Sequence, residues 1–281
     1  MIRSINLDGM FTPTAFPEIE FTTKLFSGGE IHIKLNNKID YSKVEKVVIT
    51  NRVNSSEEVI RILLTKDALM LKGIKHFDLI MPYIPYARQD RQCDEGESFS
   101  LKVFTNLINS ANFEQVICWD SHSDVAPALI NNCVNIPNNI YVSTAYLQIG
   151  NNVVLVSPDS GANKKINKLY DKLMCFHSIV KCDKHRNLSN GLLSEFEVFT
   201  DDLNGKDCLI VDDICDGGRT FIGIAKELKK KNVGNIYLFI THGIFSNGFA
   251  KLREYFHHIY TTNSIKEVEC KDFVTQFKLQ A

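Results

Sequence analysis

The chain has 281 residues, of which 44% are hydrophobic and 23% charged, and its formal net charge is −1. This balance is ordinary for a folded globular protein, and it excludes the strong basic field typical of nucleic-acid binders. No apolar run approaches the roughly 18 to 20 residues of a membrane helix, and the segment MIRSINLDGMF lacks the apolar core of a secretory signal. The eight cysteines form no C-x-x-C pair, which predicts reduced thiols and a cytoplasmic location.

Apolar runs of strand length alternate along the chain with segments of helical periodicity. Helices are predicted over residues 99–111 and 220–231, because apolar side chains recur on one face of each. Alternation of this kind is typical of βαβ units and predicts α/β domains built on mainly parallel sheets. The predicted strands are 46–50, 77–81, 115–119, 152–156, 208–212 and 235–240.

One pattern, a strand followed by a charged loop, a helix and a second strand, occurs twice. The first copy spans residues 77–122 and the second spans 208–243. We interpret the repetition as two related α/β domains. The boundary is expected near 135–150, where Asn, Pro and Gly are frequent, so we assign residues 1–140 to an N-terminal domain and 141–281 to a C-terminal domain.

The segment VDDICDGGRT connects the end of a predicted strand to a helix, which is where open α/β sheets bind ligands. Its two glycines let backbone N–H groups approach an anion, and the helix start adds the positive end of its dipole. The paired carboxylates suit ribose hydroxyls or Mg²⁺. We interpret the segment as a sugar-phosphate site, with a solvated turn as the alternative. The candidate residues are Asp212, Asp213, Asp216, Gly217, Gly218, Arg219 and Thr220.

Two further segments also follow predicted strands in the first half of the chain. In PYARQDRQCDEGESFS, Arg88 and Arg91 flank Asp90, an arrangement that suits bidentate contacts with phosphate, although a surface ion-pair cluster is equally consistent with it. In CWDSHSD, His122 could bind a metal as a neutral imidazole, but a single histidine is more often structural. The turn LFSGGE, before an alternating run, is the weakest of the candidate sites.

The second half contains two more candidates. In VSPDSGANKK, Asp159 ends a strand just before Gly161, which opens a helix, and an ordinary strand–turn–helix is the alternative. In KCDKHRNLSNG, a polar stretch begins at Lys184, His185 and Arg186. We interpret it as a mobile basic loop able to close over a polyphosphate, against the alternative of a solvated charged face.

Together and in this order, PYARQDR, VSPD, DKHR, LIVDDICDGG and THGIFS resemble the ribose-phosphate pyrophosphokinase family (PRPP synthetases), over roughly residues 24–250. That family makes phosphoribosyl pyrophosphate from ATP and ribose 5-phosphate. The resemblance implies two phosphoribosyltransferase-type domains, each a mainly parallel sheet flanked by helices. It also implies Mg²⁺ as cofactor and a homo-oligomer with ATP bound near a subunit boundary.

The resemblance further implies roles for individual residues. Catalysis would use Lys184, Arg186 and Arg88 to offset charge on the transferred diphosphoryl group and on AMP. The metal-linked positions would be His122 and Asp159, and the ribose 5-phosphate site would be the segment from Asp212 to Thr220. ATP binding would involve Phe26, Glu30, Arg88, Gln89, Asp90 and Arg91.

The phosphate loop departs from the family pattern. The family usually has Asp-Thr-Gly/Ala-Gly-Thr, whereas this chain has Asp216-Gly217-Gly218-Arg219-Thr220. A hydroxyl is missing, space is opened and a cation is added, so ADP-ribose or a similar larger 5-substituted ribose is an alternative acceptor. Gly28 likewise stands where the family usually has Asp. Three other readings stay open: a catalytically silent regulatory relative, a phosphoribosyltransferase, and a nucleotide sensor of the same fold.

Overall fold

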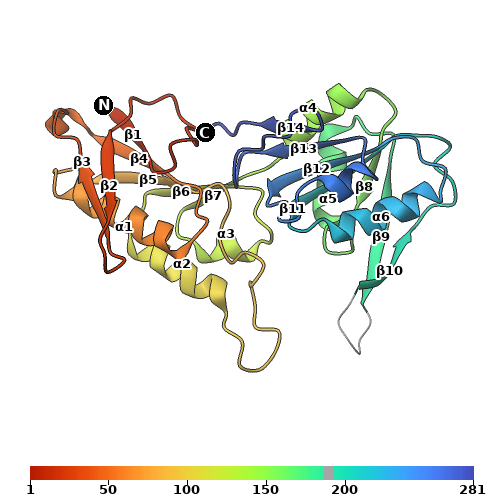
Figure 1. The fold of residues 1–281 in the computed structure, drawn as a ribbon, viewed down its shortest axis with the longest axis horizontal. Helices are drawn as coiled ribbons and strands as arrows, with labels where there is room; N and C mark the ends of the chain where they lie inside the picture. Colours follow the sequence, from red (N-terminus) through yellow and green to blue (C-terminus); the bar gives the residue numbers. More distant parts are fainter. Residues whose placement is uncertain (187–192) are drawn as a thin grey trace. The chain divides into compact units, whose positions relative to one another are not determined.

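The computed structural model describes the chain apart from residues 187–192, and at 184–186 and 193–195 it describes the backbone alone. The described chain forms two compact α/β units (Figure 1). Unit 1 consists of Met1–Ile136 with the last four residues, Lys278–Ala281, and unit 2 consists of Pro137–Phe277. No helix of the described part is both long and apolar enough to cross a membrane.

Unit 1 is built on a five-stranded sheet in which every neighbouring pair is parallel, in the order β1-β4-β5-β6-β7. Runs such as KVVIT are almost continuously apolar because strands of a parallel sheet are covered on both faces. A separate hairpin pairs two antiparallel strands, β2 (Phe21–Leu25) and β3 (Ile31–Leu35). The sheet strands are β1 (Ile2–Asn6), β4 (Lys46–Thr50), β5 (His76–Ile80), β6 (Gln115–Trp119) and β7 (Cys133–Ile136).

Helices α1 and α2 bury their apolar faces in the single core cluster of unit 1. The Ser55 side chain caps α1 by accepting a hydrogen bond from the Glu58 backbone N–H, at 3.4 Å. Alternate residues of β4 and β5 face the same cluster, so this core lies between the sheet and the helices. The helices of unit 1 are the 3₁₀ turn η1 (Tyr41–Lys43), α1 (Ser56–Met70), α2 (Ser100–Ser110) and α3 (Val125–Leu129).

Unit 2 is built on a seven-stranded sheet in the order β10-β9-β8-β11-β12-β13-β14. Only the β9–β10 edge pair is antiparallel, so both units confirm the predicted mainly parallel architecture. The strands are β8 (Val154–Ser157), β9 (Ser178–Arg186), β10 (Leu193–Val198), β11 (Cys208–Cys215), β12 (Ile236–Gly243), β13 (His258–Thr262) and β14 (Val274–Phe277).

Two core clusters lie on opposite faces of this sheet. Ile210 of β11 belongs to the cluster beneath α6, whereas its neighbours Leu209 and Val211 belong to the cluster beneath α4 and α5. This alternation is the period of two expected for a strand, so β11 is covered on both sides. The helices of unit 2 are α4 (Asn139–Ile149), α5 (Asn163–Leu173), α6 (Arg219–Lys229) and α7 (Ala250–Arg253).

Two predicted loops begin later than the sequence pattern indicated. Parallel pairing with β12 continues to Cys215, so β11 extends beyond the predicted strand 208–212 and includes Asp213, which was expected in the loop. Antiparallel pairing with β10 likewise keeps Lys184 and Arg186 in β9, where a mobile loop was expected to begin. In both cases backbone hydrogen bonds to a neighbouring strand extend the element through polar residues, which hydrophobic periodicity does not register.

Helix α6 packs against β10 through a glycine. A Cβ atom at Gly223 would stand 2.2 Å from the nearest carbon of the Phe196 ring, so the ring occupies the space that any other side chain would need. The close approach of helix and strand therefore depends on this residue.

We expect Gly223→Ala to destabilise the protein, although alanine is normally about 1 kcal/mol better than glycine inside a helix. Overpacking costs typically about 1–3 kcal/mol, which exceeds that gain. Chemical denaturation should show a lower midpoint for Gly223→Ala and partial recovery in Gly223→Ala/Phe196→Leu, where the smaller side chain leaves room. An unchanged or higher midpoint for the single variant would contradict the packing described.

Candidate active site

Three carboxylates gather where neighbouring strands of unit 2 end. Asp212 and Asp213 lie on β11, and Asp159 follows β8, which pairs with β11. The backbone N–H of Asp213 donates to Asp212 Oδ1 at 2.9 Å, and that of Ala162 donates to Asp159 Oδ1, also at 2.9 Å. The carboxyl ends of parallel strands meet at one edge, so the fold itself brings these acids together.

The acids influence one another's ionisation. Burial raises the pKa of Asp212 well above its ordinary value of 3.8, and the negative charges of Asp213 and Asp159 add to that effect. An unrelieved concentration of carboxylates costs stability, which is typical of sites that exist to bind something. A divalent cation or a set of ribose hydroxyls would relieve the repulsion.

The loop after β11 ends at the N-terminus of α6. Gly218 is the N-cap residue and has a φ of 77°, in the left-handed region that favours glycine. No side chain in the described part of the chain caps this helix, so the N–H groups of its first turn are open to a ligand. Arg219 and Thr220 begin the helix, and Arg219 is exposed. In the described part of the chain, no carboxylate lies within ion-pair distance of Arg219.

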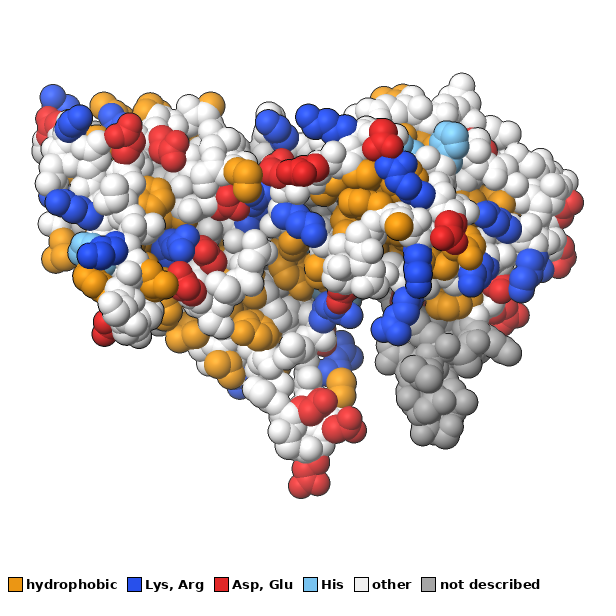
Figure 2. All heavy atoms as spheres, viewed as in Figure 1, with side chains coloured by type: hydrophobic (Ala, Val, Ile, Leu, Met, Phe, Trp, Pro, Cys, Tyr) orange, Lys and Arg blue, Asp and Glu red, His pale blue; other side chains and the backbone are white. Residues whose placement is uncertain are grey.

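Cationic side chains gather around α6 on the face drawn in Figure 2. Lys226 and Lys229 lie in the last turn of the helix, where positive charge suits the negative end of the helix dipole. The opposite end of the helix follows the loop glycines and begins at Arg219, and the Asp216 carboxylate of the same loop accepts a hydrogen bond from Ser246. An anion would therefore be favoured at the N-terminus, beside the acidic strand end.

The predicted catalytic cations lie in the β9–β10 hairpin of the same unit. Lys184 is paired with Phe196, and Arg186 with Leu193, in the antiparallel register. The side chains of Lys184 and Arg186 lie outside the described part, so their catalytic role stays a prediction. The Phe196 ring that contacts Gly223 nevertheless links this hairpin to α6, and hence to the phosphate loop.

A buried polar network lies at the end of β12. His242 is 1% exposed, and its Nδ1 lies 2.8 Å from Ser264 Oγ. Ser264 Oγ donates its own hydrogen to the Thr241 carbonyl at 2.9 Å, so it must accept from His242 Nδ1–H. The network fixes the histidine ring beside β11 and secures the segment that follows β12.

In unit 1, the PYARQDR segment forms the turn after β5. Ala87 is buried at 1% exposure and anchors the turn, whereas Arg88 and Gln89 on its far side are exposed. Tyr86 adopts a φ of 61°, which is uncommon for a residue with a bulky side chain. Strained backbone of this kind is concentrated at ligand sites.

Asp90 is the centre of a polar cluster between this turn and the end of β6. Arg91 donates to both Asp90 oxygens, at 2.8 and 3.1 Å, and Ser123 Oγ donates to Oδ2 at 2.7 Å. The hydrogen bonds from Arg91 and Ser123, with the nearby charge of His122, lower the pKa of Asp90. Asp90 therefore orients Arg91 rather than facing an anion directly, and the structure brings Asp90, Arg91 and His122 together.

The predicted adenine-contacting residues lie on the β2–β3 hairpin. Phe26 is 44% exposed, packs against the His32 ring with centroids 5.8 Å apart, and lies beneath Lys24 Nζ. A Cβ atom at Gly28 would lie 3.3 Å from Glu30 Oε2. The carboxylate of Glu30 thus lies next to position 28, where the family usually has Asp. An aspartate at this position would be repelled by Glu30.

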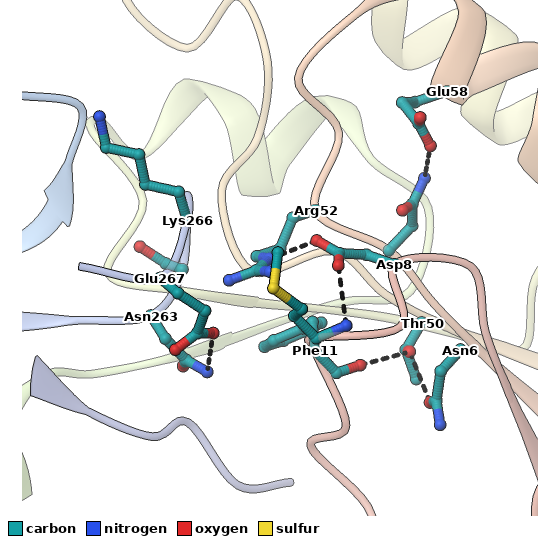
Figure 3. A network of polar contacts seen from close by, with 12 residues as sticks. Asn6, Asp8, Phe11, Thr50, Arg52, Glu58, Asn263, Lys266 and Glu267 are labelled. Atoms are coloured by element: carbon teal, nitrogen blue, oxygen red, sulfur yellow. Dashed lines mark hydrogen bonds and ion pairs between the residues drawn. The ribbon is translucent and has the colours of Figure 1, made fainter. Parts of the chain in front are cut away.

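A second polar network of unit 1 lies at the end of β4 and holds neighbouring segments of the chain together (Figure 3). Arg52 is 3% exposed, bonds to Asp8 Oδ2 at 2.5 Å, and lies over the Phe11 ring. Thr50 Oγ1 donates to Asn6 Oδ1 at 2.8 Å. These contacts tie the N-terminal segment to β4.

The two predicted metal-linked residues lie in different units, His122 in unit 1 and Asp159 in unit 2. Among the described residues, no three His, Cys, Asp or Glu side chains form a group with metal-binding geometry. The acids beside Asp212 still provide the hard oxygen ligands that Mg²⁺ prefers, and Mg²⁺ usually takes only one or two carboxylates and completes its shell with water and phosphate.

Sequence reasoning assigned no role to three polar residues that contact predicted site residues. Ser123 binds Asp90, Ser246 Oγ donates to Asp216 Oδ1 at 2.7 Å, and Asn247 Nδ2 donates to the Gly217 carbonyl at 3.2 Å. Each lies about 30 residues along the chain from its partner, so local pattern carries no signal for the contact. Only the adjacency of β11 and β12 brings Ser246 and Asn247 to the loop.

Two domains of this topology, one of which has a central acidic strand followed by a glycine loop, define a phosphoribosyltransferase-type protein. Residues 12–111 match the model of the N-terminal domain of ribose phosphate pyrophosphokinase, and residues 141–281 match the phosphoribosyl transferase domain. The chain belongs to the ribose-phosphate pyrophosphokinase family, whose members are diphosphotransferase enzymes.

Curated relatives support this assignment. The ribose-phosphate pyrophosphokinase of Agrobacterium fabrum is 30% identical over 246 residues, covering 83% of this chain and 76% of the relative. The Aquifex aeolicus enzyme of the same name is 33% identical over 227 residues, covering 79% and 70%. The crystal structure of phosphoribosylpyrophosphate synthetase from Mycobacterium smegmatis has the same fold, with a TM-score of 0.82 and 23% identity over 98% of this chain and 94% of that one.

The Asp212 carboxyl should make stability depend on pH. Because its folded-state pKa lies above 3.8, the unfolded chain binds fewer protons between the two values, and the free energy of unfolding falls as the pH rises through that range. Asp212→Asn removes this titration, and its amide oxygen can still accept the hydrogen bond from the Asp213 backbone N–H. We expect the variant to melt a few degrees higher than the wild type at pH 7 without ligand.

Asp171→Asn is the matched control, because Asp171 is exposed on α5. It should leave the thermal melting profile close to that of the wild type at every pH. If Asp212→Asn melts at or below the wild-type temperature at pH 7, the carboxyl group is not destabilising and the description of the acidic cluster is wrong.

Proposed function

We propose that this protein transfers the β,γ-diphosphoryl group of ATP to the anomeric 1-hydroxyl of a 5-phosphorylated ribose, with AMP as the leaving group. In the first form of the proposal the acceptor is ribose 5-phosphate and the product is phosphoribosyl pyrophosphate. The observation that carries it is the acidic strand end of β11 followed by the uncapped N-terminus of α6. The names of the relatives, all ribose-phosphate pyrophosphokinases, support the same chemistry.

The acceptor would bind across this strand end. The 5-phosphate would accept hydrogen bonds from the N–H groups of the Gly218–Thr220 turn, where the helix dipole also favours it. The Asp212 and Asp213 carboxylates would accept hydrogen bonds from the ribose hydroxyls. Both contacts hold the sugar in place so that its 1-hydroxyl faces the triphosphate, and positioning of this kind supplies much of the rate of a phosphoryl transfer.

The transfer itself makes one bond and breaks one. The anomeric oxygen attacks the β-phosphorus, the bond from that phosphorus to the α,β-bridging oxygen breaks, and the hydroxyl proton is released. Negative charge grows on AMP as it leaves. Arg88, on the exposed side of its turn, and Lys184 and Arg186, on β9, would stabilise that charge.

Mg²⁺ belongs to the proposal as cofactor. When bound, it would neutralise phosphate oxygens and polarise the diphosphoryl group. The acids at the end of β11 and β8 fit it, since a cation would offset both the burial of Asp212 and the repulsion from Asp213 and Asp159, which together raise the pKa of Asp212. His122 would lie on the ATP side in unit 1. The proposal also includes a homo-oligomeric state, which the family resemblance implies.

A larger acceptor is the second candidate, and the loop favours it at two positions. Gly217 adds no side chain to the loop, and Arg219 is exposed without a carboxylate partner among the described residues. ADP-ribose carries a second phosphate on its 5-substituent. The exposed guanidinium of Arg219 would bind that phosphate.

We expect the protein to form AMP when it is incubated with Mg-ATP and the correct acceptor. Ribose 5-phosphate and ADP-ribose should be tested separately, with AMP followed by chromatography and the product identified by its mass. Turnover with ADP-ribose alone would assign the acceptor to the second candidate. Absence of AMP with both acceptors would contradict diphosphoryl transfer and favour a regulatory relative or a nucleotide sensor.

We expect Lys184→Ala to lower kcat on the order of 10²-fold, as removal of one preorganised donor to a developing charge typically does. Lys181→Ala is the matched control, because Lys181 is an exposed lysine three positions earlier on the same strand. The control should retain wild-type kcat. Equal activity in both variants would show that the hairpin cation has no part in catalysis.

A further inference from the structure

The segment that follows β12 lies on the phosphate loop. The backbone N–H groups of Ile244 and Phe245 donate to the Cys215 carbonyl, and that of Ser246 donates to the Asp216 carbonyl at 3.2 Å. Phe245 is 3% exposed and has a φ of 46°, so the buried ring holds this turn in an unusual conformation. The next two side chains, those of Ser246 and Asn247, are thereby held against the loop.

Asn247 occupies the space that a side chain at position 217 would need. Its Nδ2 atom donates to the Gly217 carbonyl at 3.2 Å. A Cβ atom built on Gly217 would stand 2.7 Å from the same Nδ2 atom, closer than real Cβ contacts allow. A side chain at 217 and the carboxamide of Asn247 therefore exclude each other.

Ser246, next to Asn247 in the chain, binds the Asp216 carboxylate of the loop. Its hydroxyl donates to Asp216 Oδ1 at 2.7 Å, which holds the loop carboxylate in place on the Ser246 side. The carboxamide nitrogen of Asn247 carries two hydrogens, and the bond to the Gly217 carbonyl uses one of them. The second hydrogen is a neutral donor at the loop, of the kind that a phosphoryl oxygen accepts.

We propose that Asn247 is a specificity-determining residue of the acceptor site, which contacts the phosphoryl group on the 5-position of the ribose from outside the loop. The amide replaces the loop hydroxyl that position 217 lacks, and it can do so only because that residue is glycine. The inference rests on the proposed function, because it deepens the description of the acceptor. The ligand class is a ribose with one or more phosphoryl groups on its 5-substituent.

Gly217→Ala tests this pairing cleanly. Gly217 does not adopt a positive φ, so alanine brings no backbone strain, and its methyl group should displace only the end of the Asn247 side chain. Gly217→Ala and Asn247→Ala should then remove the same contact by two routes. Each should weaken binding of the acceptor at least about 10-fold, the size expected for one hydrogen bond to a charged group.

The experiment is a double-mutant cycle on binding. Dissociation constants for ribose 5-phosphate and for ADP-ribose are measured by calorimetry for the wild type, the two single variants and the double variant. The double variant should bind no more weakly than either single variant, because the contact is lost only once. Asn151→Ala, at an exposed asparagine in the loop before β8, is the matched control and should bind like the wild type.

Three results would overturn the inference: an Asn247→Ala variant that binds as well as the wild type, losses that multiply in the double variant, or a wild type that binds neither acceptor. Thermal melting of each variant shows that it is folded before its binding is interpreted. AMP formation is scored separately. A wild type that binds an acceptor but forms no AMP would defeat the proposed function and leave the role of Asn247 standing.

Discussion

The parallel pairing of β11 with β8 on one side and β12 on the other is the constraint on which the candidate site depends. Backbone hydrogen bonds carry β11 on to Cys215, past two acidic residues that would otherwise move apart into solvent. Burial and the neighbouring charges then raise the pKa of Asp212. The strand thus holds repelling groups together, and the stability that the rest of the sheet provides is what makes this arrangement possible.

Close approach through glycine recurs around this strand end. Gly223 admits the Phe196 ring, so α6 lies directly on β10, one of the two strands of the predicted catalytic hairpin. Gly217 admits the Asn247 carboxamide, so the segment after β12 lies directly on the phosphate loop. Gly218, with its positive φ, turns the chain into α6. At each of these positions the absence of a side chain lets a second element come close. Together the glycines connect the loop with the elements on both sides of it.

Unit 1 builds its site differently, by ordering one ion pair. Asp90 is 9% exposed and receives hydrogen bonds from Arg91 and Ser123, so the carboxylate is fully engaged by protein groups. The Arg91 guanidinium is held by both oxygens of this carboxylate, while Arg88 and Gln89 are exposed on the same turn. The interpretation of PYARQDR as an ion-pair cluster describes Asp90 and Arg91, whereas binding of ATP by this segment stays a prediction.

The sequence alone determined the architecture and the family. Strands 46–50 and 115–119 were located to the residue, because continuous apolar runs in a parallel sheet leave a clear signal, and the family assignment rested on short motifs in a fixed order. The tertiary structure alone decided how far β9 and β11 extend, because the pairing that extends them is made with a distant strand. It also decided that Ser123, Ser246 and Asn247 meet their partners. Those contacts join residues about 30 positions apart, and periodicity describes only what a residue's near neighbours in the chain impose on it.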